Sequence, residues 1–326
     1  MRPLRTARFI PGIVLAVWAA ATFAGPSDSL QPLIQVAERD LPAAPVIIAY
    51  GDTRFTDPLN VTATNPKVRR WIVDQIAQAK PDLLLVSGDL PLNGGVANDY
   101  AVYHAETEIW RAEHLLITPA LGNHEFHGDE KQCLENWWSE FPMLRAKRWY
   151  SVSLGTRVLA LNLDSDASLL PASDQINWIK AQFDNLPPSV QFVFLNLHHP
   201  PVADVQAPPD DDHNPRPNEI ALANFLKSAH TRTPVRFIVS AGHIHNYERF
   251  LQNGITYLVE GGGGAKPRPV IRGRDDLYRD EAFPNYGYVK FILHKHSLEG
   301  QMIRVRDESA VAPQWDVRDR FEISAP

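Results

Sequence analysis

Short apolar runs and amphipathic stretches follow one another in a regular order along this chain. The apolar runs at 46–50 and 83–86 are short and continuous, as in strands that are buried on both faces. Between them, apolar residues recur at helical spacing from Asn65 to about Lys80, with Asn65 as the cap and Pro66 in the first turn. This part of the chain therefore alternates strands and helices.

The same pattern continues along the chain and ends in antiparallel pairs. Further helices are expected over 99–112, 173–185 and 218–230 and inside 126–148, and further strands over 115–117, 149–154, 158–163, 191–197, 237–239, 255–259, 286–293 and 299–304. The two strands around Gly155-Thr156 read as a hairpin, so the pairing changes from parallel to antiparallel there. This order predicts an α/β sandwich with mixed sheets inside and helices outside.

Polar residues gather directly after five of the expected strands. These residues are Asp52, Asp89, Asn123-His124, His198-His199 and the stretch His243-Ile244-His245. Residues two apart in an extended backbone point to the same side, so His243 and His245 can face one centre. Because ligands of open α/β sheets bind at the carboxyl ends of the strands, we expect these side chains to form one site.

The candidate metal ligands offer nitrogen or oxygen atoms, and none of them is a thiolate. Mixed Asp, Asn and His ligation suits Mn, Fe or Zn acting as a Lewis acid. Six such ligands are too many for one ion that must also hold water and substrate. They suit two ions about 3.5–4 Å apart, bridged by a carboxylate and a hydroxide.

The order Gly-Asp, Gly-Asp, Gly-Asn-His-Glu, His-x-Pro and Gly-His-x-His resembles that of the calcineurin-like metallophosphoesterases. The stretch from Gly242 to Arg249 is most similar to the purple acid phosphatase branch, and the whole resemblance spans about residues 45–300. It implies a four-layer α/β/β/α sandwich, made of two mixed sheets flanked by helices. It also implies hydrolysis of phosphoesters at a two-metal centre.

The resemblance also implies a role for each residue of the motifs. The metal ligands would be Asp52 and His245 at the first ion, Asp89 between the two ions, and Asn123, His198 and His243 at the second ion. His124 would lie outside these ligands, where it would contact the phosphate and protonate the leaving oxygen. The two ions would be divalent or trivalent Mn, Fe or Zn.

Two positions depart from the pattern of the family. The first motif reads Asp52-Thr53-Arg54 where the broader family has Asp-x-His, and a permanently charged guanidinium cannot ligate a cation. Leu92 stands where the purple branch has its iron-binding tyrosine, so no tyrosine–iron colour is expected. We expect a weaker first metal site, in which Arg54 grips a phosphate oxygen instead.

Three further features lie near the motifs. His213 stands in a Pro-rich loop where purple acid phosphatases place substrate-facing histidines, so it is a candidate contact to the phosphate or leaving group; the alternative is an exposed loop histidine. His199 is expected to pack beside the ligands or support them rather than bind metal. The glycines at 261–264 lack the lysine and the following helix of a P-loop, so a structural role is expected for them.

The first residues have the pattern of a secretory signal peptide. Three arginines precede an apolar stretch at 9–23, and small residues predict cleavage near Ala24; a retained membrane anchor is the alternative. Cleavage would leave 29 basic against 38 acidic residues, a net charge of −9, which argues against a nucleic-acid surface. A lone Cys133 cannot form an internal disulfide, so a bacterial periplasm, or secretion from the cell, is expected.

The sequence thus divides into a signal peptide (1–24), a lead-in linker (25–44), a metallophosphoesterase catalytic domain (45–308) and a C-terminal tail (309–326). The expected function is a secreted, metal-dependent hydrolase of small phosphomonoesters. One alternative is a phosphodiesterase acting on cyclic nucleotides or phospholipid head groups, and another is a metal-bound binding protein without catalysis. No nucleic-acid binding and no stable membrane span after cleavage are expected, and the oligomeric state is not defined by the sequence.

Overall fold

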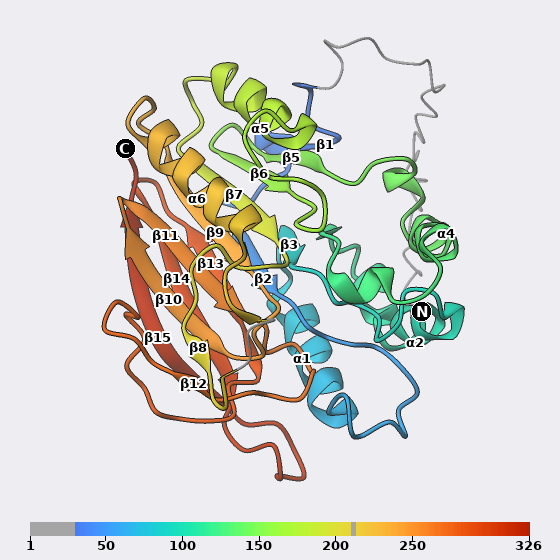
Figure 1. The fold of residues 1–326 in the computed structure, drawn as a ribbon. Coiled ribbons are helices and arrows are strands. Elements are labelled where there is room, and N and C mark those ends of the chain that lie inside the picture. Colours follow the sequence, from blue (N-terminus) through green and yellow to red (C-terminus); the bar gives the residue numbers. More distant parts are fainter. Residues whose placement is uncertain (1–29, 210–212) are drawn as a thin grey trace, which may run out of the picture.

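Two large β-sheets pack against each other in this protein, and helices cover their outer sides (Figure 1). The computed structural model describes residues 30–209 and 213–326. The predicted signal peptide, 1–24, lies outside these residues. Within them, no helix is both long enough and apolar enough to cross a membrane.

One sheet has six strands in the order β15-β14-β13-β2-β3-β4. Its strands are β2 (Val46–Tyr50), β3 (Leu83–Val86), β4 (Ile117–Pro119), β13 (Gly287–Leu293), β14 (Ser297–Val305) and β15 (Trp315–Ser324). β2, β3 and β4 are parallel, and the remaining neighbours pair antiparallel. Every residue of β3 is buried, as its continuous apolar sequence predicts.

The other sheet has seven strands in the order β1-β5-β6-β7-β9-β11-β10. Its strands are β1 (Ile34–Val36), β5 (Tyr150–Leu154), β6 (Val158–Asn162), β7 (Phe192–Leu197), β9 (Arg236–Ala241), β10 (Tyr247–Gln252) and β11 (Ile255–Glu260). β6, β7, β9 and β11 run parallel, so the carboxyl ends of these strands share one edge. β5 and β6 form the predicted antiparallel hairpin.

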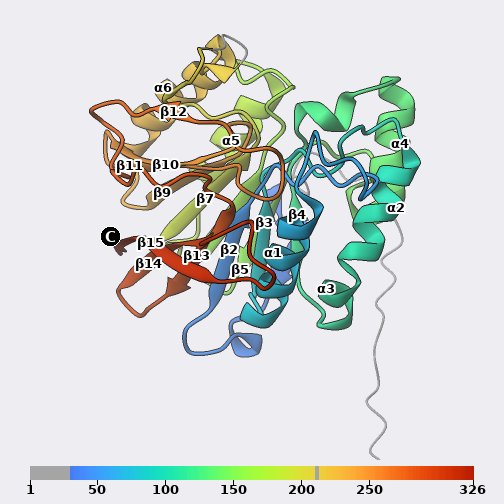
Figure 2. The same ribbon diagram turned by 90° about the horizontal axis from the view of Figure 1, so that it is seen from below.

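Helices lie on both outer sides of the sheets (Figure 2). They are α1 (Pro66–Ala79), α2 (Ala97–Glu106), α3 (Glu108–Ala112), α4 (Glu130–Glu140), α5 (Asp174–Asp184) and α6 (Pro217–His230), with short 3-10 turns η2 (Glu38–Asp40), η3 (Asn123–Phe126) and η4 (Pro142–Leu144). Asn65 caps α1 as predicted, since its side chain accepts from the N–H of Val68 at 3.3 Å. A small sheet of β8 (Val205–Gln206) and β12 (Val270–Ile271) completes the fold.

The apolar core has two parts that follow from this layering. Between the sheets, Phe194 of β7 meets Phe291 of β13 with ring centroids 5.1 Å apart, and Ile72 of α1 belongs to the same cluster. On the outer face of the seven-stranded sheet, Ile179 of α5 and Leu222 of α6 pack over β7 and β9. This arrangement of two mixed sheets between helices confirms the predicted α/β/β/α fold class.

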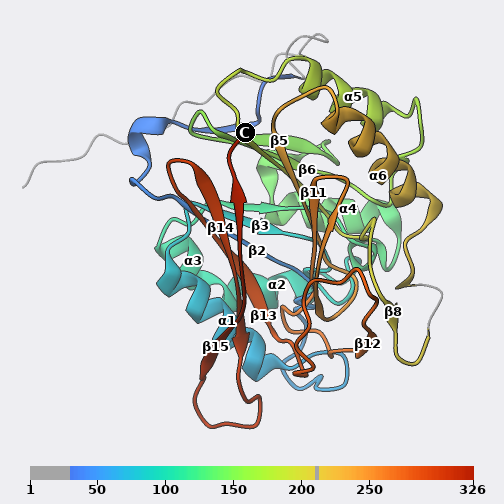
Figure 3. The ribbon, with the colours of Figure 1, turned by 90° about the vertical axis from the view of Figure 1, so that its left-hand side faces the viewer.

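Two segments that the sequence analysis left outside the domain carry strands. β15 lies in the predicted tail and pairs along its whole length with β14 (Figure 3), so the prediction of a tail over 309–326 is wrong. β1 lies in the predicted lead-in linker and pairs parallel with β5. Charged residues dilute the apolar alternation of β15, and β1 has only three residues, so neither strand has a strong sequence pattern.

Two other expectations need correction. The helix predicted over 99–112 is two helices, α2 and α3, because the chain leaves the helix at Thr107, whose hydroxyl donates to the carbonyl of Tyr103 at 2.7 Å. β10 was not predicted, because its apolar and charged residues do not alternate.

Candidate metal centre

The ends of β2 and β3 in one sheet face the ends of β7 and β9 in the other sheet, and the predicted site residues meet there. The turns after these strands are hydrogen-bonded: Asp52 N–H donates to the carbonyl of Gly88 at 3.1 Å, and Gly242 N–H donates to that of His198 at 3.0 Å. Asp52, Asp89 and His198 are fully buried. The residues that the sequence places at these strand ends therefore lie close together, while their role as one site stays a prediction.

Three candidate ligands have a left-handed backbone. The φ angles are 57° at Asp52, 53° at Asp89 and 70° at His243. Non-glycine residues seldom adopt this region, and such strain is often found at functional sites. Gly122 allows a close approach to the same centre, because a Cβ there would lie 2.5 Å from Asp89 Oδ1. The turns therefore adopt strained backbone conformations, and these direct polar side chains over the strand ends.

Asp52 and His245, the two residues predicted to hold only the first ion, face each other. His245 Nε2 lies 3.4 Å from Asp52 Oδ1, and neither atom has a hydrogen-bond partner among the described residues. The other imidazole nitrogen, His245 Nδ1, donates to the carbonyl of Lys266 at 2.7 Å. That bond leaves the lone pair of Nε2 available to a ligand, which is the arrangement of a metal-binding histidine.

The three residues predicted at the second ion also converge. His198 Nε2 lies 2.9 Å from Asn123 Oδ1 and 3.1 Å from His243 Nδ1. His198 Nδ1 donates to the carbonyl of Ser87 at 2.8 Å, so its Nε2 is the atom available to a ligand. His243 is fixed further by its backbone N–H, which donates to Asp52 Oδ2 at 2.7 Å.

Asp89 lies beside both groups, since one ligand atom each of Asp52, Asp89 and His198 lie within 4.8 Å of one another. Its Oδ1 is 3.2 Å from His198 Nε2 and accepts from the N–H of His124 at 2.9 Å. Burial alone would raise the pKa of Asp89, but the neighbouring His198, His124 and Arg54 lower it below its usual range. The carboxylate is therefore ionised and available to cations.

Arg54 contacts Asp89 directly, which its sequence position did not reveal. Its Nη2 lies 3.3 Å from Asp89 Oδ2, and its side chain is 15% exposed. Its backbone N–H donates to the Asp89 carbonyl at 3.0 Å, so both the backbone and the side chain of Arg54 contact Asp89. The guanidinium thus places a fixed positive charge beside the central carboxylate.

His124 lies at the rim of the cluster. Its Nδ1 is 2.6 Å from the carbonyl of Leu92, its Nε2 is 3.7 Å from Asp89 Oδ2, and its ring packs on that of His127 with centroids 4.0 Å apart. Burial lowers the pKa of His124 to about 4, although Asp89 opposes this shift. A protonated His124 would therefore be a strong proton donor.

His213 and His199 lie against His243. The His213 ring stacks on the His243 ring with centroids 4.7 Å apart and planes 24° apart, so the loop histidine is at the site. The His199 ring is 4.3 Å from the same ring, and it is buried. One nitrogen each of His198, His199 and His243 lie within 4.8 Å of one another, so His199 lies directly beside two of the predicted ligands.

Two buried glutamates support the turns, and the sequence analysis gave them no role. Glu125 accepts N–H bonds from Asp89 at 3.0 Å, Leu90 at 2.8 Å and Gly122 at 2.8 Å, and burial raises its pKa to about 8. Glu260 accepts from Ser240 at 2.8 Å and supports the neighbouring turn in the same way. The place of Glu125 inside the Gly-Asn-His-Glu motif was the only signal for it.

The donor set fits a pair of metal ions. It consists of carboxylate, amide and imidazole groups, and one ligand atom each of Asp52, Asp89 and His198 lie within 4.8 Å of one another. Asp52 Oδ1 and His245 Nε2 are buried without a hydrogen-bond partner among the described residues, so a cation between them would remove an otherwise unfavourable arrangement. The division of ligands between two ions stays a prediction.

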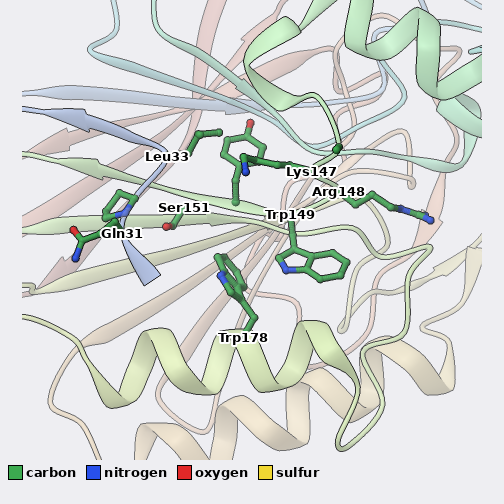
Figure 4. A pocket seen from close by; sticks show the side chains of 10 residues that line it. Gln31, Leu33, Lys147, Arg148, Trp149, Ser151 and Trp178 are labelled. Carbon is green, nitrogen blue, oxygen red and sulfur yellow. The ribbon is translucent and has the colours of Figure 1, made fainter. Parts of the chain in front are cut away.

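A separate cavity of about 570 Å³ lies beside β5 and α5, away from these ligands (Figure 4). Trp149 and Trp178 lie along its wall, with Lys147 and Arg148 at the side of Trp149. Arg148 pairs with Asp164, which begins the turn after β6. None of the predicted metal ligands lines this cavity, so the cavity is not the predicted site.

A family model described as calcineurin-like phosphoesterase matches residues 46–247. Among solved structures, the purple acid phosphatase PPD1 from yellow lupin (Lupinus luteus) seeds is similar, with a TM-score of 0.68, 19% identity and 86% of this chain covered. The chain spans 54% of the lupin protein's length. No curated protein matches the sequence.

Two other solved structures have the same fold. A dimetal phosphatase from Danio rerio is similar over 89% of this chain and 100% of its own, with a TM-score of 0.56 and 14% identity. GAP50, described as the anchor in the inner membrane complex of Plasmodium, is similar over 85% of this chain and 90% of its own, with a TM-score of 0.58 and 13% identity. The chain belongs to the calcineurin-like phosphoesterase family of hydrolases.

Proposed function

We propose that this protein hydrolyses phosphomonoesters at a centre of two metal ions. The observation that carries the proposal is the convergence of six predicted ligands from five separate turns, with Asp89 beside both groups. Asp52 Oδ1 and His245 Nε2 are 3.4 Å apart on one side, and Asn123 Oδ1 and His198 Nε2 are 2.9 Å apart on the other. Such a set has few purposes other than holding cations.

The chain's own groups have distinct tasks in this proposal. Two bound ions would supply Lewis acidity and a water of lowered pKa. Arg54 and His213 flank the ligands and are proposed to bind phosphoryl oxygens, Arg54 with a fixed positive charge. His124, once protonated, would give its proton to the departing alcohol oxygen. The ionised Asp89 would hold the ions in place.

The preference for monoesters rests on the purple acid phosphatase resemblance. The motif from Gly242 to Arg249 resembles that branch, and the lupin structure is named a purple acid phosphatase. Metal identity is proposed as Mn, Fe or Zn, since the ligands are oxygen and imidazole nitrogen atoms.

The test compares Asp89→Ala and His243→Ala with the wild-type protein. After loading with Mn or Zn, the wild type should hydrolyse p-nitrophenyl phosphate, and both variants should lose at least about a thousandfold in kcat/KM, because the ions lose a ligand. Matched controls are Asp40→Ala and His104→Ala, which change exposed residues of the same types. Full activity of either site variant would contradict the proposed site.

The same assay separates the alternatives. Faster hydrolysis of bis(p-nitrophenyl) phosphate than of the monoester would favour a diesterase of cyclic nucleotides or phospholipid head groups. Metal content without turnover of either ester would favour a binding protein; GAP50, with the same fold, is described as an anchor. Metal analysis of the purified wild type is therefore measured beside the two rates.

We also propose that the protein is exported to the periplasm or secreted. The support is the basic, apolar and small-residue order of positions 1–24. Amino-terminal sequencing of the protein from a periplasmic extract should find a chain that begins near Gly25. An intact Met1 on protein confined to the cytoplasm would contradict export.

A further inference from the structure

His199 is a buried imidazole beside the predicted ligands that the proposed function leaves without a task. Its side chain is 5% exposed, and its ring centroid is 4.3 Å from that of His243 and 4.8 Å from that of His198. One of its nitrogens lies within 4.8 Å of a ligand nitrogen of each of these two histidines. The imidazole could therefore act either as an additional metal ligand or as a contact to substrate.

Ser165 decides between these two roles. Its Oγ accepts the backbone N–H of His199 at 3.1 Å and lies 2.8 Å from His199 Nδ1. The hydroxyl has one proton, and no other acceptor for it occurs among the described residues. The hydroxyl proton has an acceptor only when Ser165 Oγ–H donates to Nδ1, and the neutral imidazole then carries its own proton on Nε2. A protonated Nε2 cannot ligate a metal, but it can donate a hydrogen bond.

Asp166 does not reverse this tautomer. Its Oδ1 is 4.0 Å from His199 Nδ1, which is beyond hydrogen-bond range. The same oxygen is 3.4 Å from Arg216 Nη1, so its charge is already paired. Ser165 therefore remains the partner of Nδ1.

Several hydrogen bonds hold the turn that carries Ser165. Arg216 Nη2 and Asn218 Nδ2 donate to the Ser165 carbonyl at 2.8 Å and 2.9 Å, and Asp164 Oδ1 accepts the N–H of Asp166 at 2.9 Å. A group held by several hydrogen bonds loses little freedom when it binds a ligand, as a preorganised donor should.

From this geometry we propose that His199 donates a hydrogen bond from Nε2 to a phosphoryl oxygen of the substrate, and that Ser165 sets the required tautomer. The inference rests on the proposed function for the identity of the ligand, which is a phosphoester or free phosphate. His199 touches the substrate in this role, whereas Ser165 acts through His199 and is a positioning residue.

The experiment measures binding of inorganic phosphate to the metal-loaded protein by calorimetry, together with metal content. His199→Phe should keep the wild-type metal content and weaken phosphate binding about tenfold or more, because a hydrogen bond to a charged group is lost. His199→Gln keeps an amide donor and should recover part of the affinity. Ser165→Ala should weaken binding less than His199→Phe. The matched control is Ser151→Ala, which removes a buried hydroxyl that has no hydrogen-bond partner among the described residues.

Two results with the variants, and one result by NMR, would overturn the inference. A fall in metal content in both His199→Phe and His199→Gln would make His199 a ligand, and unchanged phosphate affinity in all His199 variants would leave it without contact to phosphate.

If His199→Phe does not fold, nitrogen NMR of the wild-type His199 ring gives the answer: a proton on Nε2 is expected, and a proton on Nδ1 overturns the assignment. Phosphate binding that depends on His199 without any ester turnover would refute the proposed function only, whereas turnover with unaltered phosphate binding would refute the inference only.

Discussion

At the scale of single residues, the His124 ring is hydrogen-bonded to the backbone and has a lowered pKa. Its Nδ1 is held at 2.6 Å from the carbonyl of Leu92, and burial lowers its pKa to about 4. A group of this kind matters most when the leaving oxygen is strongly basic and needs a proton. His124→Ala should therefore lower kcat about a hundredfold or more for an alkyl phosphate, and much less for p-nitrophenyl phosphate.

The two substrates act as controls for each other in this measurement. An equal loss for both esters would mean that His124 supports the site in some other way than by protonating the leaving group.

Arg54 gives a second prediction, because it competes with cations for Asp89. The guanidinium is 3.3 Å from Asp89 Oδ2 and stands where the family has a metal-binding histidine. Arg54→Ala removes a positive charge, so the first ion should bind several-fold more tightly, while KM for the phosphoester should rise about tenfold through loss of an anion contact. Metal titration by calorimetry and steady-state kinetics measure the two effects.

Arg39→Ala, at an exposed arginine, is the matched control. An unchanged KM together with unchanged metal affinity in Arg54→Ala would show that the residue has only a structural role.

The predicted ligands were recognisable because they are residue types that bind metals and because they follow one another in a characteristic order. Asp52, Asp89 and His198 each follow an apolar run, and the structure brings them together. Glu125 and the His199–Ser165 pair were not foreseen. Their roles depend on partners more than thirty residues away, such as Glu125 with Asp89, and no local pattern records such a contact.

At the scale of secondary-structure elements, β15 contacts β10, the strand that follows the Gly-His-x-His motif. Asp319 of β15 accepts from Arg249 Nε at 2.6 Å and from its Nη2 at 3.1 Å, and the hydroxyl of Tyr247 donates to it at 3.0 Å. Arg249 also lies 4.7 Å from the ring of Phe321. The Tyr-Glu-Arg part of the motif therefore binds a segment that looked like a tail.

This pair predicts a measurable coupling. Asp319 and Arg249 are 11% and 16% exposed, so the pair is mostly shielded from water. Asp319→Ala should lower the free energy of unfolding by about 1–3 kcal/mol, and a double-mutant cycle with Arg249→Ala should give a coupling of at least about 1 kcal/mol. Urea denaturation measures both quantities.

The exposed pair Lys180–Asp184 on α5 serves as control, and its coupling should not exceed about 0.5 kcal/mol. A coupling at Arg249–Asp319 as small as that of the control would mean that β15 is not fastened to β10 in this way.

Elements with strong periodicity were predicted closely, and elements held by distant partners were not. β3 and α1 have continuous or helical apolar patterns of their own. β15 and β10 carry several charges, and they become strands because β14 and β11 supply their hydrogen bonds. Strand pairing between distant segments is a property of the assembled sheet, which single-strand patterns do not contain.

At the scale of the whole molecule, a buried carboxyl cluster joins the loop after β7 to β10 and to the segment after β12. Glu248 Oε2 accepts the N–H of Asp204 at 2.6 Å, and Asp276 Oδ1 accepts the N–H of Arg249 at 3.1 Å. Arg272 pairs with Asp276, so one guanidinium faces three carboxyl groups. These groups cannot all be ionised without large repulsion, and at least one of them should hold a proton in the folded protein.

Asp204 is the member of this cluster whose titration can be followed. Burial raises its pKa to about 6 with a contribution from Asp276, although the N–H of Gly273 opposes the shift. Between about pH 4, where an unfolded aspartate loses its proton, and about pH 6, the folded protein binds a proton that the unfolded chain has released. The stability contributed by this proton is complete below the window and is lost as pH rises through it.

Asp204→Asn should remove this dependence, because an amide remains neutral at every pH. The free energy of unfolding of the variant should therefore improve relative to wild type as pH rises from 4 to 6, and the difference should be constant above that range. Urea denaturation at intervals of half a pH unit measures the difference, so titrations of groups common to both proteins cancel.

Asp184→Asn, at an exposed aspartate, should give a nearly constant difference instead. A constant difference for Asp204→Asn would place the shared proton on Glu248, whose pKa burial also raises, and Glu248→Gln would then show the pH-dependent change.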